Sequence, residues 1–157
     1  MSKVLILYYS KTGNTEEMVQ YIEEGVKKEG VDVDIKKVQD VTPDVLLEYD
    51  GIIIGSPTYY GSMAAEIKQL FDESVRFHGD LTGKVGGAFT SAANLAGGNE
   101  TTILGILKAM LIHGMIIQGD AMGDHYGPVA IGKPDERAKK ECMKLGGNIA
   151  RLVKRLK

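Results

Sequence analysis

The sequence predicts an α/β fold of three layers, in which a mostly parallel five-stranded sheet lies between two layers of helices. Two observations predict it. Short apolar runs rich in β-branched residues alternate along the chain with longer segments whose apolar residues recur every three or four positions. Parallel strands also need long crossover connections, which are usually helices that return over the sheet in a right-handed sense. The alternation therefore favours one parallel sheet with helices on both faces.

Five segments have the composition of strands. The first and third are the most apolar, and the third has the run Ile52-Ile53-Ile54 at its centre. The second alternates between apolar and polar residues, as a half-buried strand does. The expected strands are residues 3–9, 31–38, 50–55, 84–91 and 115–118.

Four longer segments have the period of a helix. In the last of them the apolar residues recur at alternating steps of four and three and form one continuous stripe. Thr42 and Pro43 supply a cap and a first-turn proline for a further short helix between the second and third strands. The expected long helices are residues 15–29, 64–75, 100–111 and 134–156.

Composition limits the classes of function. A chain of 157 residues, 43% of them hydrophobic, can bury one core, so residues 1–157 are expected to form a single domain. A net charge of -2 gives no basic stripe, so no nucleic-acid partner is expected. No apolar stretch is long enough for a membrane span or a signal peptide, which predicts a soluble, cytoplasmic protein. The single cysteine, Cys142, excludes an internal disulfide, so redox chemistry would need a bound cofactor.

A polar loop follows the first predicted strand and leads into the first predicted helix. The first N–H groups of a helix are unpaired, and the helix dipole favours an anion there. Hydroxyl and amide side chains beside a glycine would form a nest of neutral donors for a phosphate monoester. The same residue types are ordinary helix caps, so the loop alone leaves both interpretations open. Its residues are Ser10, Lys11, Thr12, Gly13, Asn14 and Thr15.

Residues that other phosphate chemistries require are missing from this loop. It contains neither the lysine-bearing loop of nucleoside triphosphatases nor the glycine fingerprint of dinucleotide binding. No aspartate ends the first or third strand, as a phospho-receiver domain would need, and no cysteine in the loop could serve a thiol phosphatase. Flavin mononucleotide (FMN) is the phosphate ligand that fits best.

Several segments carry a family resemblance. Residues 8–15 resemble the phosphate loop of flavodoxins, and residues 55–63 resemble the second flavin loop of the flavodoxin-like NAD(P)H:quinone oxidoreductases, the tryptophan-repressor-binding-protein family. Residues 89–100, the string His113-Gly114-Met115 and the pair Tyr126-Gly127 are also similar to that family. The resemblance implies a flavodoxin-like αβα sandwich with strand order 2-1-3-4-5 and one FMN. Two insertions of the quinone oxidoreductases are shortened here, and a tryptophan that flanks the flavin in some of them is replaced near Arg76.

Two further loops are expected to hold the flavin ring. After the third strand, two tyrosines lie between a proline and a glycine, and a tyrosine there would cover one face of the ring. After the fourth strand, a small, neutral and glycine-rich loop would let main-chain N–H groups approach the ring, and the resemblance places it at the pyrimidine side. The expected contacts are Pro57, Thr58, Tyr59, Tyr60 and Gly61 in the first loop and Ser91, Ala92, Ala93, Asn94, Gly97 and Gly98 in the second.

Histidines complete the set of candidates. The family resemblance makes His113 the expected catalytic residue, a donor to reduced flavin or to substrate, whereas without the resemblance it is a structural histidine. His125 and Tyr126 lie in a turn-rich loop before the last helix and are candidate substrate contacts. The histidines have no metal-ligand spacing with one another or with carboxylates, so no metal site is expected.

Two classes of function stay open. One is an enzyme that takes a hydride from NAD(P)H and reduces a quinone-type acceptor in two-electron steps. The other is a flavodoxin that carries single electrons between protein redox partners. The enzyme is preferred because the second loop and the string around His113 are closest to the quinone oxidoreductases, and because residues 90–99 contain no Asp or Glu that would oppose a second electron.

The third predicted helix indicates an assembly of several chains. Lys108 is the only charged residue in its middle, so more than one of its faces is apolar. A single sheet covers one face of a helix, and a second copy would cover another. We therefore expect a homodimer or a homotetramer.

Overall fold

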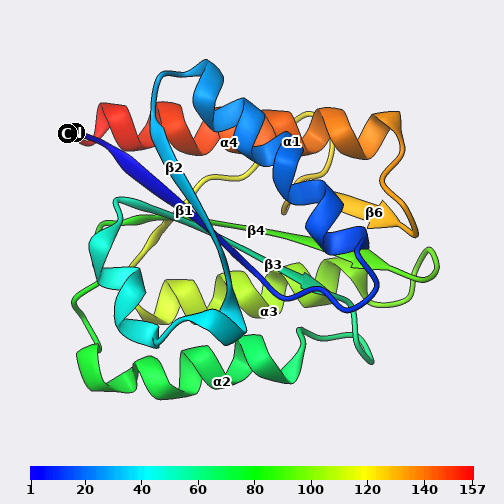
Figure 1. The fold of residues 1–157 in the computed structure, drawn as a ribbon, viewed down its shortest axis with the longest axis horizontal. Coiled ribbons are helices and arrows are strands. Elements are labelled where there is room, and N and C mark those ends of the chain that lie inside the picture. The colour runs from blue at the N-terminus through cyan, green and yellow to red at the C-terminus, as the bar shows by residue number, and fades with distance from the viewer.

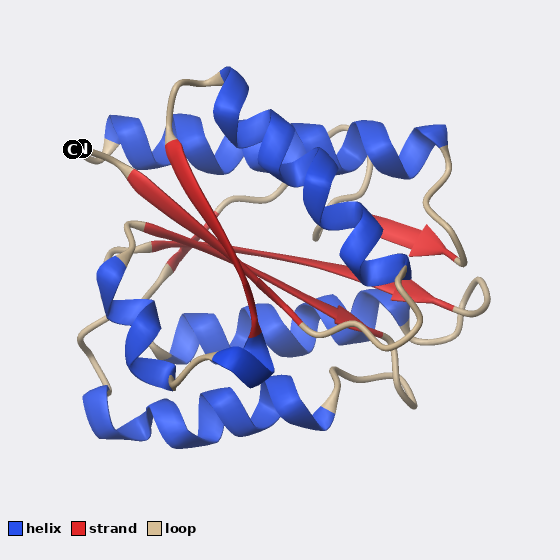
Figure 2. Cartoon of the chain, in the orientation of Figure 1, coloured by secondary structure: helices blue, strands red, loops and turns tan.

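The computed structural model describes residues 1–157 and has the three predicted layers (Figures 1 and 2). Helices α1 and α4 lie on one face of the sheet, and α2 and α3 lie on the other (Figure 1). The helices are α1 (Asn14–Lys28), α2 (Ala65–Glu73), α3 (Asn99–Ile112) and α4 (Glu136–Arg155), with the short 3-10 helices η1 (Val38–Asp40), η2 (Pro43–Glu48) and η3 (Ser74–Phe77). The strands are β1 (Lys3–Tyr8), β2 (Asp32–Lys37), β3 (Gly51–Pro57), β4 (Val85–Ala92), β5 (Ile116–Ile117) and β6 (Val129–Ile131).

The sheet confirms the predicted parallel order, β2-β1-β3-β4-β5. It also contains β6, which the sequence analysis missed. β5 pairs with the beginning of β4, and β6 pairs in parallel with the end of β4. The two short strands thus lie along the same edge of β4, separated in the chain by residues 118–128. A strand of three residues between Pro128 and Gly132 is too short to show alternation, which explains why it was overlooked.

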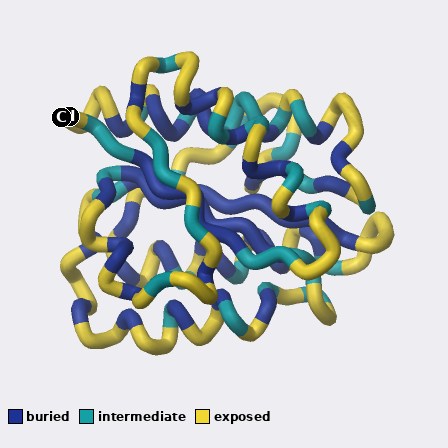
Figure 3. Tube along the Cα trace, viewed as in Figure 1, coloured by how far each residue is buried: buried dark blue, intermediate teal, exposed yellow.

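The core occupies both faces of the central strands. Residues of β1 and β3 such as Leu5, Ile6 and Ile53 are fully buried, because helices cover the sheet on each side. Burial on both faces explains the continuous apolar runs in these strands, whereas the edge strand β2 keeps its alternation. Figure 3 shows the buried strands at the centre of the molecule and exposed loops around them.

Helices α1 and α4 approach each other closely at two glycines. A Cβ atom at Gly25 would clash with the carbonyl oxygen of Met143, and one at Gly146 would clash with that of Ile22. Main chain therefore packs on main chain, which fixes α1 and the loop before it relative to the sheet. None of the four helices combines the length and apolar character that a bilayer crossing needs.

The predicted helix boundaries differ from the structure in three places. The segment at Thr42 and Pro43 forms the 3-10 helix η2, and the Thr42 side chain makes no capping bond. Helix α2 ends at Glu73 and continues as η3, which leaves Val75 exposed rather than in the apolar stripe. In α4 the stripe stops at Val153, and Leu156 is half exposed.

Candidate functional site

The three predicted flavin loops meet at one edge of the sheet. β1, β3 and β4 run parallel and end at this carboxyl edge, on the right of Figure 1. Ligand sites of open parallel sheets form at this edge, where strand order reverses between neighbouring crossovers. The sheet therefore brings together the segments 10–15, 57–61 and 91–98.

The first loop leaves its main-chain donors uncommitted. The N–H groups from Lys11 to Thr15 have no protein acceptor, and the N–H of Glu16 donates to Ser10 Oγ at 3.3 Å. Gly13 is the cap residue of α1, with φ +101, and no side chain caps the helix. Thr12 and Asn14 make no side-chain hydrogen bond within the protein. The Thr12 hydroxyl and the Asn14 amide are therefore not spent on capping, which favours the anion-nest interpretation over the simple cap.

The side chain of Thr15 contacts another residue of the protein and is not, as had been expected, free for a phosphate. Its hydroxyl is buried and lies 2.7 Å from Ser91 Oγ, which is also buried. This contact joins the first loop to the end of β4. The Thr15 side chain thus positions the loop, and only the main-chain N–H of Thr15 is free to bind a ligand.

The second loop is a tight hairpin turn with exposed aromatic side chains. The N–H of Tyr59 donates to Ser62 O at 2.9 Å, and the N–H of Ser62 donates to Tyr59 O at 3.0 Å. Between them Tyr60 and Gly61 both have positive φ, +49 and +75, as a type I′ turn requires. A left-handed tyrosine is strained, and such strain clusters at ligand sites. The Tyr60 side chain is fully exposed and Tyr59 is 40% exposed, so both are open to a flat ring.

A buried polar network joins the second and third loops. The N–H of Thr58 donates to Ser91 O at 2.7 Å, and its hydroxyl lies 2.8 Å from Thr90 Oγ1. The Thr90 hydroxyl in turn donates to Ser56 O at 2.7 Å. Satisfied networks of this kind hold a backbone in one arrangement. Sequence reasoning missed Ser56 and Thr90, although two polar residues within apolar strands were a usable signal.

The third loop is exposed and closely touches the second. Ala93 and Asn94 are exposed, and Ala96 has φ +60. A Cβ at Gly98 would clash with the Cα of Gly61, so only glycine permits this contact between loops. The Thr101 hydroxyl donates to Gly61 O at 2.7 Å and ties the turn to α3.

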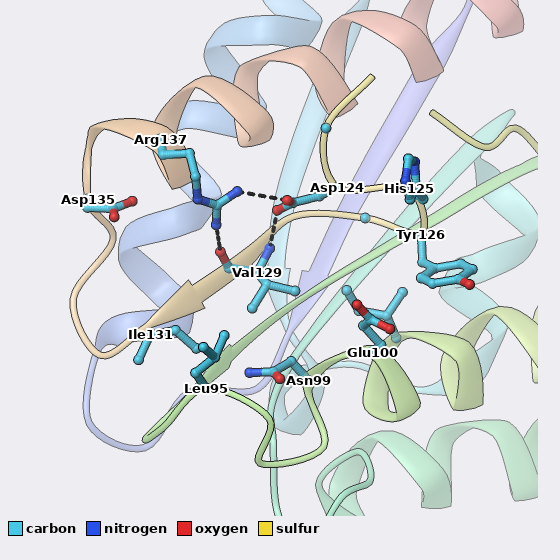
Figure 4. A pocket seen from close by; sticks show the side chains of 13 residues that line it. Leu95, Asn99, Glu100, Asp124, His125, Tyr126, Val129, Ile131, Asp135 and Arg137 are labelled. Atoms are coloured by element: carbon cyan, nitrogen blue, oxygen red, sulfur yellow. Dashed lines mark hydrogen bonds and ion pairs between the residues drawn. The ribbon is translucent and has the colours of Figure 1, made fainter. Parts of the chain in front are cut away.

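His125 and Tyr126 lie beside the third loop rather than on the first two. Together with Leu95, Asn99 and Glu100 they line a cavity of about 440 Å³ (Figure 4). The structure thus brings the predicted substrate contacts to one side of the segment predicted to bind the cofactor. Sequence reasoning did not assign Asn99 or Glu100 to a site.

An ion pair holds the loop that carries these residues. Arg137 Nη1 donates to Asp124 Oδ1 at 2.7 Å, and Arg137 Nη2 donates to Val129 O at 2.6 Å. Asp124 Oδ2 also accepts the N–H of Val129 at 3.0 Å, and the Asp124 hydrogen bond raises the pKa of Arg137. Arg137 lies in the first turn of α4, where the helix dipole disfavours a positive charge. This unfavourable position was the one signal in the sequence that Arg137 has a carboxylate partner.

The structure does not bring His113 to these loops within one chain. His113 follows α3, whose 14 residues carry the chain about 21 Å back toward the amino edge of the sheet. There its Nε2 lies 2.7 Å from Ser74 Oγ, and Nδ1 is buried without a partner. Within one chain His113 therefore lies away from the three loops, and its catalytic role stays a prediction. The resemblance carried the residue type to this position but could not show which edge of the sheet it occupies.

Tyrosines near the loops stay neutral. Burial, with the nearby Glu16 carboxylate, raises the pKa of Tyr8 to about 12. Burial also raises the pKa of Tyr59. Both phenols are therefore protonated at neutral pH.

The donors around the first loop fit a phosphate monoester, because free N–H groups, hydroxyls and one amide surround it without an acidic side chain inside residues 10–15.

Comparison with known proteins places the chain in a family. A family model described as flavodoxin domain matches residues 5–99. A flavodoxin of Clostridium saccharobutylicum is 39% identical over 160 residues, which cover 98% of this chain and 99% of that one. An NAD(P)H dehydrogenase (quinone) of Rhizobium rhizogenes is 39% identical over 141 residues, 76% of this chain and 71% of that one. A solved flavodoxin from the domain Archaea is 32% identical and superposes with a TM-score of 0.81 over 97% of this chain and 99% of its own. The chain therefore belongs to the flavodoxin family, whose cofactor is FMN.

Proposed function

We propose that the chain binds one FMN at the carboxyl edge and uses it to pass electrons from NAD(P)H to a quinone-type acceptor. Residues 10–15 would hold the phosphate, because the N–H groups from Lys11 to Thr15 and the Thr12 hydroxyl are uncommitted. Tyr59 and Tyr60 would cover the ring, and residues 91–98 would line its pyrimidine side.

Bound FMN would supply the redox chemistry, by which NAD(P)H, a proton and a quinone become NAD(P)⁺ and a hydroquinone. The chain would bind and orient the reactants. Main-chain N–H groups of the third loop, with Asn94, would stabilise negative charge at the pyrimidine edge. Residues 90–99 contain no Asp or Glu to oppose that charge. This neutral loop is the observation that carries the preference for a two-electron enzyme.

A one-electron carrier between protein partners is the second candidate. It is supported by the flavodoxin of Clostridium saccharobutylicum, whose match covers 98% of this chain, against 76% for the quinone dehydrogenase of Rhizobium rhizogenes. Exposed loops around the site also suit a protein partner. Both candidates bind FMN at the carboxyl edge of the sheet. They differ in the electron donor, which is NAD(P)H for the enzyme and a protein partner for the carrier.

We also propose a homodimer or homotetramer. On α3, Ile103, Ile106, Leu107 and Met110 are buried in the chain's own core. Leu104 is 41% exposed, Leu111 58% and Ile112 67%, so a second face of the helix is apolar and open. Light scattering at micromolar concentration tests this, and a strictly monomeric mass would overturn it.

Anaerobic mixing of the FMN-loaded protein with NADH and with NADPH tests the enzyme proposal. We expect at least one of them to bleach the flavin band, and a quinone added afterwards to restore it. Dithionite provides the control, because it reduces any accessible flavin. Bleaching by dithionite but by neither nicotinamide would discard the enzyme in favour of the carrier.

A further inference from the structure

The cavity beside the third loop has the composition of a small-molecule site. It opens between the first turn of α3 and β6, and Figure 4 shows Asn99 and Glu100 on one side and Val129 on the other. Ile103, which is fully buried, and Val129 give it an apolar lining, and Leu95 is 80% exposed at its border. Its volume of about 440 Å³ falls within the range typical of ligand pockets.

The only arginine or lysine in the lining is already committed. Arg137 donates from one nitrogen to Asp124 and from the other to the carbonyl of Val129, at 2.7 and 2.6 Å. Its charge is therefore neutralised within the protein. A phosphate or sulfonate entering the cavity would find no free arginine or lysine.

The uncompensated charge in the cavity is negative. Asp124 is paired with Arg137, whereas Asp135 caps α4 by accepting the N–H of Ala138 at 2.8 Å and forms no ion pair. Glu100, exposed in the first turn of α3, has neither a hydrogen bond nor an ion pair. An anionic ligand would meet this carboxylate directly, whereas an uncharged ligand would not be repelled.

Neutral donors are available for a carbonyl oxygen. The hydroxyl of Tyr126 has no partner in the protein, and that residue is 46% exposed. Asn99 is only 7% exposed, yet the single bond from its amide is a long one, 3.4 Å to Asn94 O. A flat ring with carbonyl groups would place its ring on the apolar lining and its oxygens toward these donors.

We propose that this cavity binds the acceptor, that it selects uncharged quinones over anionic ones, and that Glu100 determines this selectivity. The class of ligand rests on the proposed function, whereas the charge selectivity rests on the cavity alone. The same carboxylate would keep the phosphates of NAD(P)H out of the cavity. The nicotinamide would then have to reach the flavin from the open side, over the turn at Tyr60 and Gly61.

Two matched ligands test the proposal by binding to the FMN-loaded protein. The probes are 2-methyl-1,4-naphthoquinone, which is neutral, and 1,4-naphthoquinone-2-sulfonate, which is anionic. Their dissociation constants are measured by titration, with ¹⁵N chemical shifts to locate the bound ligand. We expect shifts at Asn99 and Tyr126 and a preference for the neutral quinone on the order of tenfold.

Charge reversal then identifies the responsible residue. Glu100→Gln should narrow the preference to a few-fold, and Glu100→Lys should strengthen binding of the sulfonate by about tenfold over the wild type. Glu136→Lys is the matched control, because Glu136 also lies in a first helical turn but is 85% exposed and outside the cavity lining. It should change neither constant by more than about twofold.

The outcomes separate this proposal from the proposed function. Equal binding of the two quinones, equal effects of the two lysine variants, or shifts confined to residues outside the cavity would each overturn it. Binding in the cavity without bleaching by NADH or NADPH would keep the cavity assignment and remove the enzyme. Bleaching by a nicotinamide with no quinone in the cavity would keep the enzyme and remove the cavity assignment.

Discussion

The two edges of the sheet use their main-chain groups in opposite ways. At the amino edge the N–H of Asp50 donates to Lys3 O, and the N–H of Lys3 donates to the Asp50 carboxylate, each at 2.9 Å. The N–H of Ile116 likewise donates to Lys84 O at 2.8 Å. At the carboxyl edge the N–H groups from Lys11 to Thr15 have no protein acceptor, and Tyr60 adopts a left-handed conformation.

The difference separates the edge that stabilises the fold from the edge whose main-chain groups are free to bind a ligand. Paired main-chain groups contribute to stability, whereas unpaired groups and strained residues persist only where the surroundings hold them. Here the buried contacts between Thr15 and Ser91 and between Thr58 and Thr90 hold the open loops from below. Substitutions at the amino edge should therefore change stability, and those at the carboxyl edge should change ligand affinity.

The largest effect is expected in the first loop. The double substitution Thr12→Val with Asn14→Ala removes two neutral donors and should weaken FMN binding by about 2–6 kcal/mol, at 1–3 kcal/mol for each charge-assisted bond. Fluorescence titration of the flavin-free protein measures it. The midpoint of urea unfolding should stay unchanged, because neither side chain has a protein partner. An equal loss of affinity for riboflavin, which lacks the phosphate, would show that the loop does not bind that group.

The reciprocal experiment is made at the amino edge. Burial favours a raised pKa for Asp50, but hydrogen bonds from Lys157 and from the Lys3 N–H hold it below its usual range. Asp50→Ala leaves that N–H without an acceptor and should lower the free energy of unfolding by about 1–2 kcal/mol. Urea denaturation tests the loss, with FMN affinity as the control. A large fall in FMN affinity at unchanged stability would break the contrast between the edges.

Acid should weaken the amino edge through His113. Burial, together with the nearby His78, lowers the pKa of His113 below its usual range. The unfolded chain then binds this proton more readily, so stability is complete above the unfolded pKa of about 6.5 and falls as the pH drops toward the folded value, by at most about 1.4 kcal/mol per pH unit. His113→Gln should flatten this part of the stability profile. Identical profiles for His113→Gln and the wild type would contradict the assignment.

The smallest effect concerns strain in the second loop. Asn before Gly is preferred in a type I′ turn, so Tyr60→Asn should raise the stability of the flavin-free protein by roughly 0.5–1 kcal/mol. The fully exposed Tyr60 ring buries nothing that this change would lose. FMN affinity should fall in the same variant. Thermal unfolding measures the gain in stability, and FMN titration measures the loss of affinity. A variant that is less stable than the wild type would show that the turn is not strained.

Much of the fold could be predicted from the sequence. The buried runs around Ile6 and Ile53 and the periodic helices indicated a parallel αβα sandwich, and the strand order followed from the family resemblance. β6 escaped because three residues carry no period. Helix η2 was predicted as a short helix, but Pro43 after a threonine indicates only a helical start and not its 3-10 geometry.

The site divides in the same way. The sequence predicted which loops meet, because the end of each parallel strand is read from its boundary. It could not show that Thr15 bonds to Ser91 or that Arg137 is paired with Asp124, whereas the place of His113 at the amino edge follows from its position just before the fifth strand. The two contacts escaped for the same reason. Each of these depends on contacts between residues far apart in the chain, and no local period or composition records them.

The division between the two edges can be measured directly by titrating FMN into the ¹⁵N-labelled, flavin-free protein. The account predicts the largest chemical-shift changes at the N–H groups of Lys11 to Thr15, with further changes in residues 58–61 and 92–98. The N–H groups of Asp50, Lys84 and His113 should not move, and riboflavin should move the ring loops but leave residues 11–15 largely in place. Shifts that are as large at the amino edge as in the first loop, or identical for FMN and riboflavin, would contradict it.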